Sequence, residues 1–423
     1  MDHRGGDRLR GASRERDGGA PALHERPPLE VPTVTVAPAG ARRALRRHPW
    51  IYRSDVREVP EKLENGAVVR VVDERGRPLG RAGWSARSKI SLRFFRWEDE
   101  PVDRAFWEAR LEDALERRRA CGSTGPARRV VFAEGDEWPG FVVDQYGDSL
   151  AVQTLTPAAE RLAPRWVEVL VERLGSRSVV ARNDLKVREL EGLPRGIETW
   201  HGDPPPEPFP VVIGDHEFVV DLVGGQKTGA YLDQQENYRA AARWAATAPE
   251  PRRALDVFAG EGGFALHLSA TVESVEAVET SAEAVARGVA NAARNGVTNV
   301  VWTTANGFDR LNELDVEGAR FDLVVLDPPA FAKNRKSVPG ARRGYKEINL
   351  RALKILSPGG ILVTCSCSYH LDRAMLLEIV ADAAGDVGKT VELLEIRTQA
   401  ADHPILVNVP ETEYLKCLVM RVR

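Results

Sequence analysis

The chain has 423 residues, of which 43% are hydrophobic and 29% are charged, and its formal net charge is −3. This balance is typical of a globular protein with several buried cores, and it excludes a chain that binds nucleic acid through bulk positive charge. No apolar run approaches the roughly 18 residues that span a bilayer. Residues 1–30 lack the apolar segment of a secretory signal. We therefore expect a cytoplasmic protein without membrane contact.

The cysteines and arginines narrow the class further. Cys121, Cys365, Cys367 and Cys417 are widely spaced except for one pair, which fits neither a disulfide framework nor a zinc ligand set, so free thiols are expected. Arginines cluster in ARRALRRHPW and KNRKSVPGARRGYK. Such patches can meet phosphate, but a solvated surface explains them as well.

The first hundred residues divide into a tail and a β-rich unit. Residues 1–30 are rich in Gly, Arg, Asp and Pro without apolar periodicity, which predicts a disordered tail. Residues 31–101 contain the β-branched segments VPTVTV, AVVRVVDE and SLRFFRW, separated by Gly, Pro and Asp turns. This pattern predicts a compact all-β barrel.

Residues 102–205 mix helical and strand patterns. The segments DRAFWEARLEDALERRRACG and AAERLAPRWVEVLVERLG have helical apolar spacing, whereas RRVVFAEGDEWPGFVVDQYGDSLAVQTLT and SVVARND contain strand patterns. They predict a small α+β middle domain. The proline-rich GDPPPEPFP that follows is the best linker candidate in the chain.

Residues 206–423 begin with a hairpin, VVIGDHEFVVDLV, and then alternate between strands and helices. ALDVF, SVEAVE, NVVWTT, FDLVVLD and GILVTCS are typical of buried parallel strands, and amphipathic helices follow them. We expect a doubly wound, Rossmann-like α/β domain. VELLEIR and EYLKCLVMRVR would complete its sheet with an antiparallel edge.

Two acidic strand ends and a glycine loop indicate a nucleotide site. Gly260, Gly262 and Gly263 lie where the first strand turns into a helix, so backbone N–H groups can approach a ligand, although NAD sites share this feature. Glu279 ends the second strand, where a carboxylate accepts hydrogen bonds from ribose hydroxyls. Asp327 is followed by two prolines at the end of a central strand, an element typical of methyltransferases that act on bases. The expected cofactor is therefore S-adenosylmethionine.

The fifth strand ends with Cys365 and Cys367. Residues two apart point to the same face unless the strand has already ended. A buried cysteine is usually a small hydrophobic residue, but this strand end is beside the expected methyl donor. A thiolate that adds to C6 of cytosine makes C5 nucleophilic, and the carboxyl group of Asp327 would stabilise the charge that develops. This pair fits carbon methylation.

From about residue 33 to 423 the chain resembles the PUA-containing large-subunit ribosomal RNA cytosine-5 methyltransferases of bacteria. The resemblance rests on RRHPWIYRSDV, EGDEWPGFVVDQYGD, ARNDLKVRELEGL, KTGAYLDQQENYR, DVFAGEGGF, DPPAFAK, GYKEINLRALKILSPGG, SCS and DHP. It implies a PUA-like RNA-binding domain, an α+β middle domain and a Rossmann-like class I methyltransferase domain with S-adenosylmethionine as donor. Its RNA substrate would present an unstacked base in a single-stranded or loop region.

The resemblance also implies roles for individual residues. Cys367 matches the nucleophile, with Cys365 as the alternative. The donor-site positions are Asp256, Phe258, Gly260, Gly262, Glu279 and Asp327, and residues 227–234, which include Tyr231, Asp233 and Gln234, match a loop that closes over the donor. Asn306 stands where the family usually has an acidic residue at the adenine edge. Asp402-His403-Pro404 matches a family motif or a turn that braces the site. His48, Trp50 and Arg53 are expected to hold RNA, although Trp50 also fits a core position.

Two other functions fit the sequence. A relative that methylates nitrogen, at guanine N7 or an exocyclic amine, would need Asp-Pro-Pro alone. A non-catalytic RNA-binding assembly factor would keep the fold without the chemistry, although the intact glycines, Glu279 and Asp327 oppose that interpretation. The sequence does not identify the modified nucleotide, and it leaves open whether the chain forms a homodimer.

Overall fold

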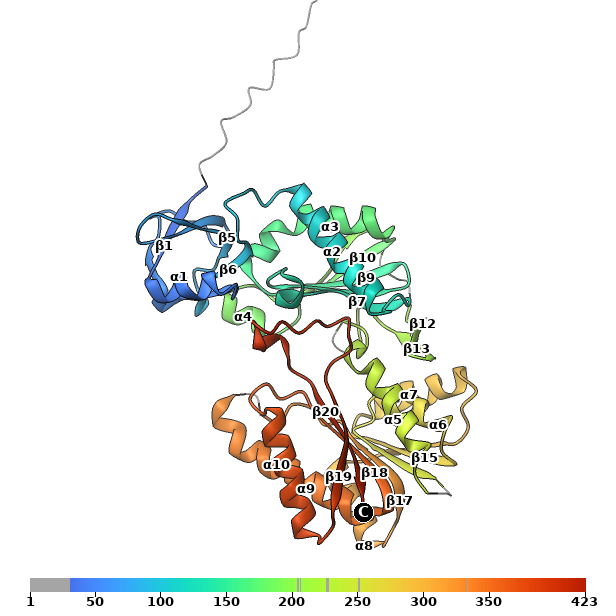
Figure 1. Ribbon diagram of the computed structural model, residues 1–423. Helices are drawn as coiled ribbons and strands as arrows, with labels where there is room; N and C mark the ends of the chain where they lie inside the picture. Colours follow the sequence, from blue (N-terminus) through green and yellow to red (C-terminus); the bar gives the residue numbers. More distant parts are fainter. Residues whose placement is uncertain (1–30, 204, 206, 226–227, 250–251, 333) are drawn as a thin grey trace, which may run out of the picture. The chain divides into compact units, whose positions relative to one another are not determined.

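The computed structural model describes residues 31–203, 205, 207–225, 228–249, 252–332 and 334–423, and Figure 1 traces the chain through them. The predicted disordered tail, residues 1–30, lies outside the described residues. Residues Pro32–Arg423 together form one compact body. Three smaller units follow one another along the chain within it. Among the described helices, none is long and apolar enough to cross a membrane.

The first unit, described throughout residues 31–101, is a curled sheet of six strands. They are β1 (Thr33–Val36), β2 (Trp50–Tyr52), β3 (Val56–Glu58), β4 (Val68–Asp73), β5 (Pro78–Trp84) and β6 (Ile90–Arg96), with helix α1 (Pro38–Leu45), in the order β2-β6-β5-β4-β1-β3. The two edge strands are joined by only the turn η1 (Arg53–Asp55). Such a link spans at most about 14 Å, whereas the edges of a flat sheet of this size would be about 24 Å apart. The sheet must therefore curl, and the predicted barrel is confirmed.

The middle unit, also fully described, is a sheet covered by two helices. Its elements are α2 (Arg104–Ala120), β7 (Ala127–Phe132), η2 (Ala133–Asp136), β8 (Phe141–Tyr146), β9 (Ser149–Thr154), α3 (Pro157–Leu174), β10 (Ser178–Arg182), α4 (Val187–Glu191) and β11 (Ile197–His201), with strand order β11-β10-β9-β8-β7. Both long helices begin at capping side chains, Asp103 and Thr156. They pack together over a core that contains Trp107, Trp138 and Trp166. This is the α+β arrangement that the mixed pattern predicts.

The C-terminal unit begins with the hairpin β12 (Phe209–Ile213) and β13 (His216–Val220) and continues as a doubly wound sheet. Its other elements are η3 (Leu232–Gln234), α5 (Gln235–Ala245), β14 (Arg253–Val257), α6 (Gly263–Ser269), β15 (Ser274–Glu279), α7 (Ala282–Arg294), β16 (Val300–Thr304), α8 (Gly307–Val316), β17 (Phe321–Leu326), η4 (Arg335–Ser337), α9 (Val338–Ile355), β18 (Leu356–Ser366), α10 (Arg373–Asp386), β19 (Val391–Arg397), η5 (Pro410–Thr412) and β20 (Lys416–Val422). Its sheet order is β16-β15-β14-β17-β18-β20-β19.

Both faces of this sheet are buried, which explains the continuous apolar strands. In β17, Leu323 and Val325 belong to the core on one face, while Val324 and Leu326 belong to the core on the other. The Rossmann-like prediction is confirmed. The strand order reverses between β14 and β17, which places a ligand crevice at their carboxyl ends.

The expected antiparallel edge differs in one respect. The reversed strand β20 lies between β18 and β19, so the edge strand β19 runs parallel to β18. Burial explains this order. All but one of the residues of β20 are buried, so this strand needs neighbours on both sides, whereas the side chains of β19 are half-buried or exposed and suit an edge.

Candidate active site

The glycine loop after β14 exposes its backbone toward open space at Gly260. Phe258, Gly260 and Gly262 have positive φ angles of 69°, 55° and 98°. Phe258 is strained in this conformation, as residues at functional sites often are. Its N–H donates to the carbonyl oxygen of Val278 (2.9 Å), which ties the loop to β15. A Cβ atom on Gly260 would meet nothing within 4 Å. A ligand can therefore come close to this backbone.

Glu279, at the end of β15, is fixed beside this loop. Gly260 N–H donates to Glu279 Oε2 (3.0 Å), and Ser281 N–H donates to Glu279 Oε1 (2.9 Å). A carboxylate has about four acceptor sites. Glu279 can therefore also accept hydrogen bonds from two neighbouring ribose hydroxyls, so the residues present fit an adenosine group.

Asp256, in β14, contacts the start of helix α6. Its side chain has no exposed area, and Ala265 N–H donates to Asp256 Oδ2 (2.9 Å). Oδ1 has no hydrogen-bond partner among the described residues. Burial, and then the charge of Asp327, raises the pKa of Asp256 to about 8. The side chain therefore carries a proton at neutral pH and stabilises the start of α6.

Asp256→Asn should change how stability depends on pH. Between the ordinary pKa of 3.8 and the folded value of about 8, the unfolded chain has released this proton while the folded protein keeps it. Each pH unit of increase therefore lowers the free energy of unfolding by about 1.4 kcal/mol through this group. Asparagine removes that term, so Tm should fall less between pH 5 and 7.5 in the variant than in the wild type. Equal slopes in thermal denaturation would contradict this assignment.

Asn306 begins helix α8. Its Oδ1 accepts a hydrogen bond from Phe308 N–H (2.9 Å), and the side chain is exposed. Aspartate and asparagine cap helices about equally well. The amide therefore preserves the helix start, while its contact with the adenine edge stays a prediction.

Asp327 follows β17 at the position where the strand order reverses. Gln234 Nε2 donates to Asp327 Oδ2 (3.0 Å), and Asn237 Nδ2 donates to Gln234 Oε1 (2.6 Å). Gln234 and Asn237 are almost fully buried. This chain of hydrogen bonds from α5 sets the orientation of the Asp327 carboxyl group.

The end of β18 separates the two cysteines. Cys365 lies inside the strand opposite Cys417, has no exposed area and belongs to the apolar core. Burial, and then the neighbouring Cys417, raises the pKa of Cys365 well above its ordinary value. Cys367 lies just beyond the last strand residue, Ser366, and is half-buried. The expectation that both thiols point to one face depended on a longer strand.

Cys367 and Asp327 follow neighbouring parallel strands, in which Leu326 of β17 pairs with Thr364 of β18. Burial raises the pKa of Tyr231 to about 12, and the charges of Asp327, Asp233 and Cys367 contribute. Burial also raises the pKa of Tyr345 to about 12, with contributions from Cys367 and Asp327. The Tyr345 hydroxyl lies 3.3 Å from Ser368 Oγ. The thiol and the carboxyl group therefore lie at the same edge of the sheet, and both contribute to the pKa values of the two tyrosines.

Two residues beside the end of β18 were not predicted from the sequence: Tyr345, and Lys416, which pairs in register with Ser366. Tyr345 belongs to the apolar face of an amphipathic helix, where it is indistinguishable from a core residue. Lys416 had a weak signal, because it is a lysine at the start of the apolar strand KCLVMRV.

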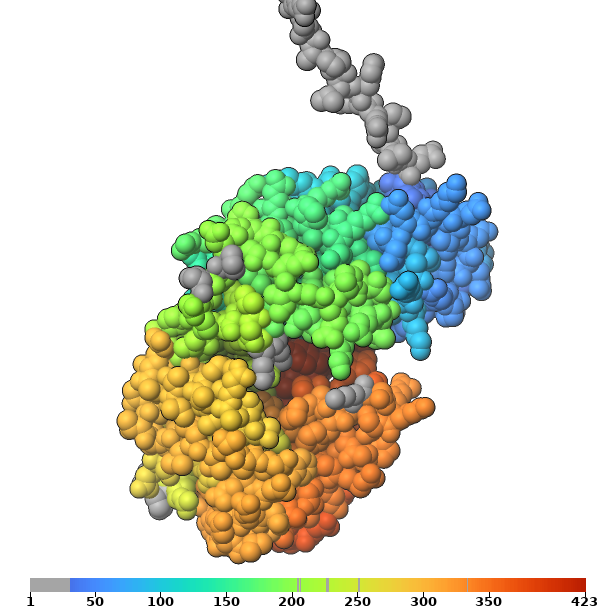
Figure 2. Space-filling model, turned by 180° about the vertical axis from the view of Figure 1, so that it is seen from behind, coloured from blue at the N-terminus to red at the C-terminus, as the bar shows by residue number. Residues whose placement is uncertain are grey.

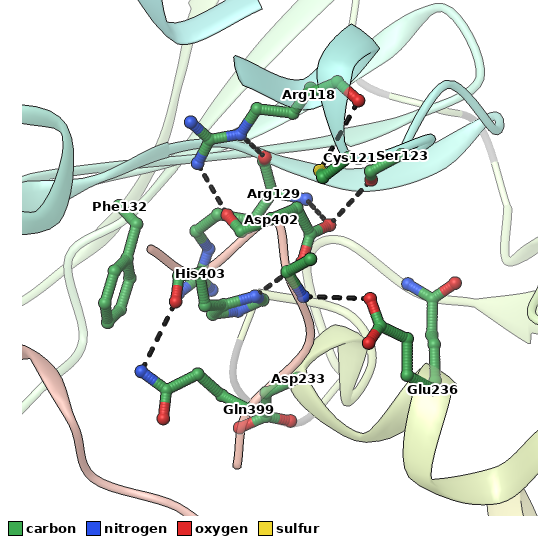
Figure 3. Close-up of polar contacts among 12 residues, drawn as sticks. Arg118, Cys121, Ser123, Arg129, Phe132, Asp233, Glu236, Gln399, Asp402 and His403 are labelled. Atoms are coloured by element: carbon green, nitrogen blue, oxygen red, sulfur yellow. Dashed lines mark hydrogen bonds and ion pairs between the residues drawn. The ribbon is translucent and has the colours of Figure 1, made fainter. Parts of the chain in front are cut away.

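Residues 398–415 hold the end of the predicted closing loop, residues 227–234. Tyr414 Oη donates to Asp233 Oδ2 (2.7 Å), and Ala400 N–H donates to the carbonyl oxygen of Asp233 (2.8 Å). Gln399 Nε2 donates to the carbonyl oxygen of His403 (3.3 Å), as Figure 3 shows. Asp233 and its neighbour Gln234 are therefore held from two sides. Lys227, the start of the predicted closing loop, lies outside the described residues.

The Asp402-His403 turn joins this segment to the middle unit. His403 Nδ1 lies 2.7 Å from Asp402 Oδ1. Ser123 Oγ (3.1 Å) and Arg129 N–H (2.9 Å) donate to Asp402 Oδ2, and Arg118 Nη2 donates to the Asp402 carbonyl oxygen (2.5 Å) (Figure 3). Burial raises the pKa of Asp402, but the hydrogen bonds and positive charges outweigh it and leave the pKa low. These contacts favour the bracing interpretation.

The three residues expected to hold RNA all have partners within the protein. Trp50 Nε1 donates to Glu134 Oε1 (2.8 Å), and His48 Nε2 lies 3.2 Å from Glu411 Oε2. Arg53 Nη2 donates to the carbonyl oxygen of Ser88 (3.0 Å). These side chains position neighbouring loops, and their contact with RNA stays a prediction.

In Figure 2, a hollow lies between the green middle-unit residues and the orange residues of the C-terminal unit, with red C-terminal residues on its floor.

Known proteins match this arrangement in sequence and in fold. Residues 34–97 match a PUA-like domain, and residues 181–421 match the S-adenosylmethionine-dependent methyltransferase family. The ribosomal RNA large subunit methyltransferase I of Tolumonas auensis is 40% identical over 386 residues, which cover 89% of this chain and 96% of the relative. The protein of that name from Aeromonas salmonicida is 37% identical and covers 90% and 96%. A structure titled as a SAM-dependent methyltransferase from Streptococcus mutans has a TM-score of 0.77 and 16% identity, and covers 92% and 99%.

The fold and the site define a class I methyltransferase that uses S-adenosylmethionine and carries an N-terminal PUA-like domain. The chain belongs to the ribosomal RNA large subunit methyltransferase I family.

Proposed function

We propose that this protein methylates C5 of a cytosine in large-subunit ribosomal RNA, with Cys367 as the covalent nucleophile. The observation that carries the proposal is the half-buried thiol of Cys367, which lies just past β18, beside the end of β17 that Asp327 follows. Cys365 is the weaker candidate because its thiol is buried and its pKa is raised. Nitrogen methylation would leave this thiol without a role.

The proposed reaction begins with the Cys367 thiolate. Its sulfur forms a bond to C6, and the electrons of the C5–C6 double bond shift so that C5 becomes nucleophilic. The carboxylic acid of Asp327, oriented by Gln234, donates its proton to N3, where the addition places negative charge. After C5 gains its methyl group, a base removes the C5 proton and the electrons of that bond re-form the C5–C6 double bond. The S–C6 bond breaks to release the Cys367 thiolate, and N3 returns its proton to Asp327.

S-adenosylmethionine supplies the electrophilic methyl group when bound. The Gly260 and Gly262 backbone would lie against it, and Glu279 would accept its ribose hydroxyls. Asn306 would meet the adenine edge, and Tyr231, Asp233 and Gln234 would close over the methionine side.

The choice of substrate rests on the relatives and on the first domain. Relatives that match nearly their whole length are named as methyltransferases of large-subunit ribosomal RNA, and a PUA-like domain favours RNA. The cysteine must reach C6, so the target base must be unstacked, as in a loop. The enzyme would act in the cytoplasm, as expected for a methyltransferase of ribosomal RNA. The described residues give no support for the homodimer considered from the sequence.

Nucleoside mass spectrometry of ribosomal RNA tests the proposal. Cells that lack the gene should lose one 5-methylcytidine from large-subunit RNA, and the wild-type gene should restore it while Cys367→Ala should not. Methylated guanosines and adenosines should be unchanged and serve as the internal control. Unchanged 5-methylcytidine, or the loss of a methylated guanosine instead, would show that the proposed product is wrong.

A further inference from the structure

A buried lysine lies beside the strand end that carries Cys367. Lys416 begins β20, is 4% exposed, and pairs in register with Ser366, the residue before Cys367. Its Nζ donates to the carbonyl oxygens of Ser368 (2.7 Å) and Tyr414 (2.9 Å). These bonds use two of the three donors of an ammonium group. The amine is therefore anchored at the peptide segment that carries the thiol.

Acidic neighbours oppose the effect of burial on this group. Burial lowers the pKa of Lys416, and the charges of Cys367, Glu413 and Asp372, in that order, raise it, which leaves a pKa of about 8. Lys416 is therefore mainly an ammonium ion at pH 7. Electrostatic stabilisation between two groups is mutual. If the Cys367 thiolate favours the ammonium form of Lys416, the ammonium group equally favours the thiolate.

We propose that Lys416 is a positioning residue for the nucleophile, whose ammonium group, held by Ser368 and Tyr414, favours the thiolate form of Cys367. The inference rests on the proposed function, in which Cys367 attacks the base. A thiolate is the reactive form of cysteine, and an adjacent cation raises its population.

Several acidic groups lie at this strand end. Asp327 follows β17 beside this strand end, since Leu326 pairs with Thr364 of β18, and its ionised form disfavours a second negative charge. Tyr231 and Tyr345 have raised pKa values and stay neutral at pH 7. The two acids near Lys416 have partners of their own: Arg373 Nη2 lies 2.7 Å from Glu413 Oε1, and Asp372 Oδ1 accepts from Met375 N–H (2.8 Å).

Alkylation of the thiols by iodoacetamide at different pH values tests the proposal without RNA. Peptide mass spectrometry follows Cys367 in the full-length protein, and the exposed Cys121 serves as an internal reference. In the wild type, the midpoint of the Cys367 profile should lie below that of Cys121. Lys416→Met should raise the Cys367 midpoint by about one pH unit, a tenfold loss of relative rate at pH 7, and should leave Cys121 unchanged.

Two further variants separate charge from structure. Lys416→Arg retains a cation with several donors and should keep the low midpoint. Lys354→Met removes an exposed lysine that pairs with Asp315 (2.8 Å) on the surface of α9 and should change neither midpoint. A wild-type Cys367 midpoint at or above that of Cys121 overturns the proposal even if Lys416→Met does not fold. So does an unchanged midpoint in folded Lys416→Met. Because alkylation is measured without methyl transfer, its failure is distinct from an active Cys367→Ala variant, which would overturn the proposed function.

Discussion

Cys367→Ala should lose methyl transfer by about four to six orders of magnitude, as expected when a covalent nucleophile is removed. Without the sulfur atom no bond to C6 can form, and C5 of cytosine is too weak a nucleophile to react by itself. The fold should remain, because the half-buried side chain lies beyond the end of β18. Incorporation of labelled methyl groups into unmodified large-subunit RNA measures the loss, and Tm checks the fold.

A matched pair of cysteine variants identifies the nucleophile. Cys365→Ala lies two residues away in the same segment but removes a buried thiol, so it should keep activity within severalfold and lose about 1 kcal/mol of stability. RNA with 5-fluorocytosine should trap a covalent complex with Cys365→Ala but not with Cys367→Ala, because fluorine blocks removal of the C5 substituent. Full activity in both Cys367→Ala and Cys365→Ala would exclude the covalent mechanism. Inactive but folded Cys365→Ala would transfer the role to Cys365.

Local sequence patterns predicted most of the fold because each pattern reports a local environment. The continuous apolar strands ALDVF and FDLVVLD are buried on both faces of the sheet, as parallel strands must be. The glycines and Glu279 mark strand ends, and strand ends meet at one edge of a parallel sheet. The positions of Gly260, Glu279 and Asp327 followed from this rule without any knowledge of tertiary contacts.

Features that depend on tertiary contacts could not be predicted. The roles of Cys365 and Cys367 diverge because β18 ends at Ser366, and strand ends are poorly defined by sequence. The partner of Trp50 is Glu134, 84 residues away, and nothing near Trp50 in the sequence indicates it. The inner position of β20 and the approach of Lys416 to Cys367 depend on the order of the last strands.

Asp327→Asn should lower kcat by about 10²- to 10³-fold, the usual cost of losing a group that stabilises charge in a transition state. Asparagine can still accept the hydrogen bond from Gln234 Nε2, so the loop and α5 should keep their arrangement. It cannot supply the charge or the proton of a carboxyl group at the ring edge. Affinity for S-adenosylmethionine, measured by calorimetry, should change less than tenfold, which separates a loss of chemistry from a loss of binding.

Asp322→Asn is the matched control for this prediction. Asp322 lies near the other end of the same strand, where its Oδ2 accepts a hydrogen bond from Arg253 N–H (2.9 Å), and asparagine can also preserve that bond. Both variants change one carboxyl group on β17 or at its end, but only Asp327 lies at the carboxyl end where the strand order reverses. Asp322→Asn should therefore keep kcat within about twofold. If the two variants have the same kcat, the carboxyl group of Asp327 has no role in the chemistry and only the shape of the Asp-Pro-Pro corner matters.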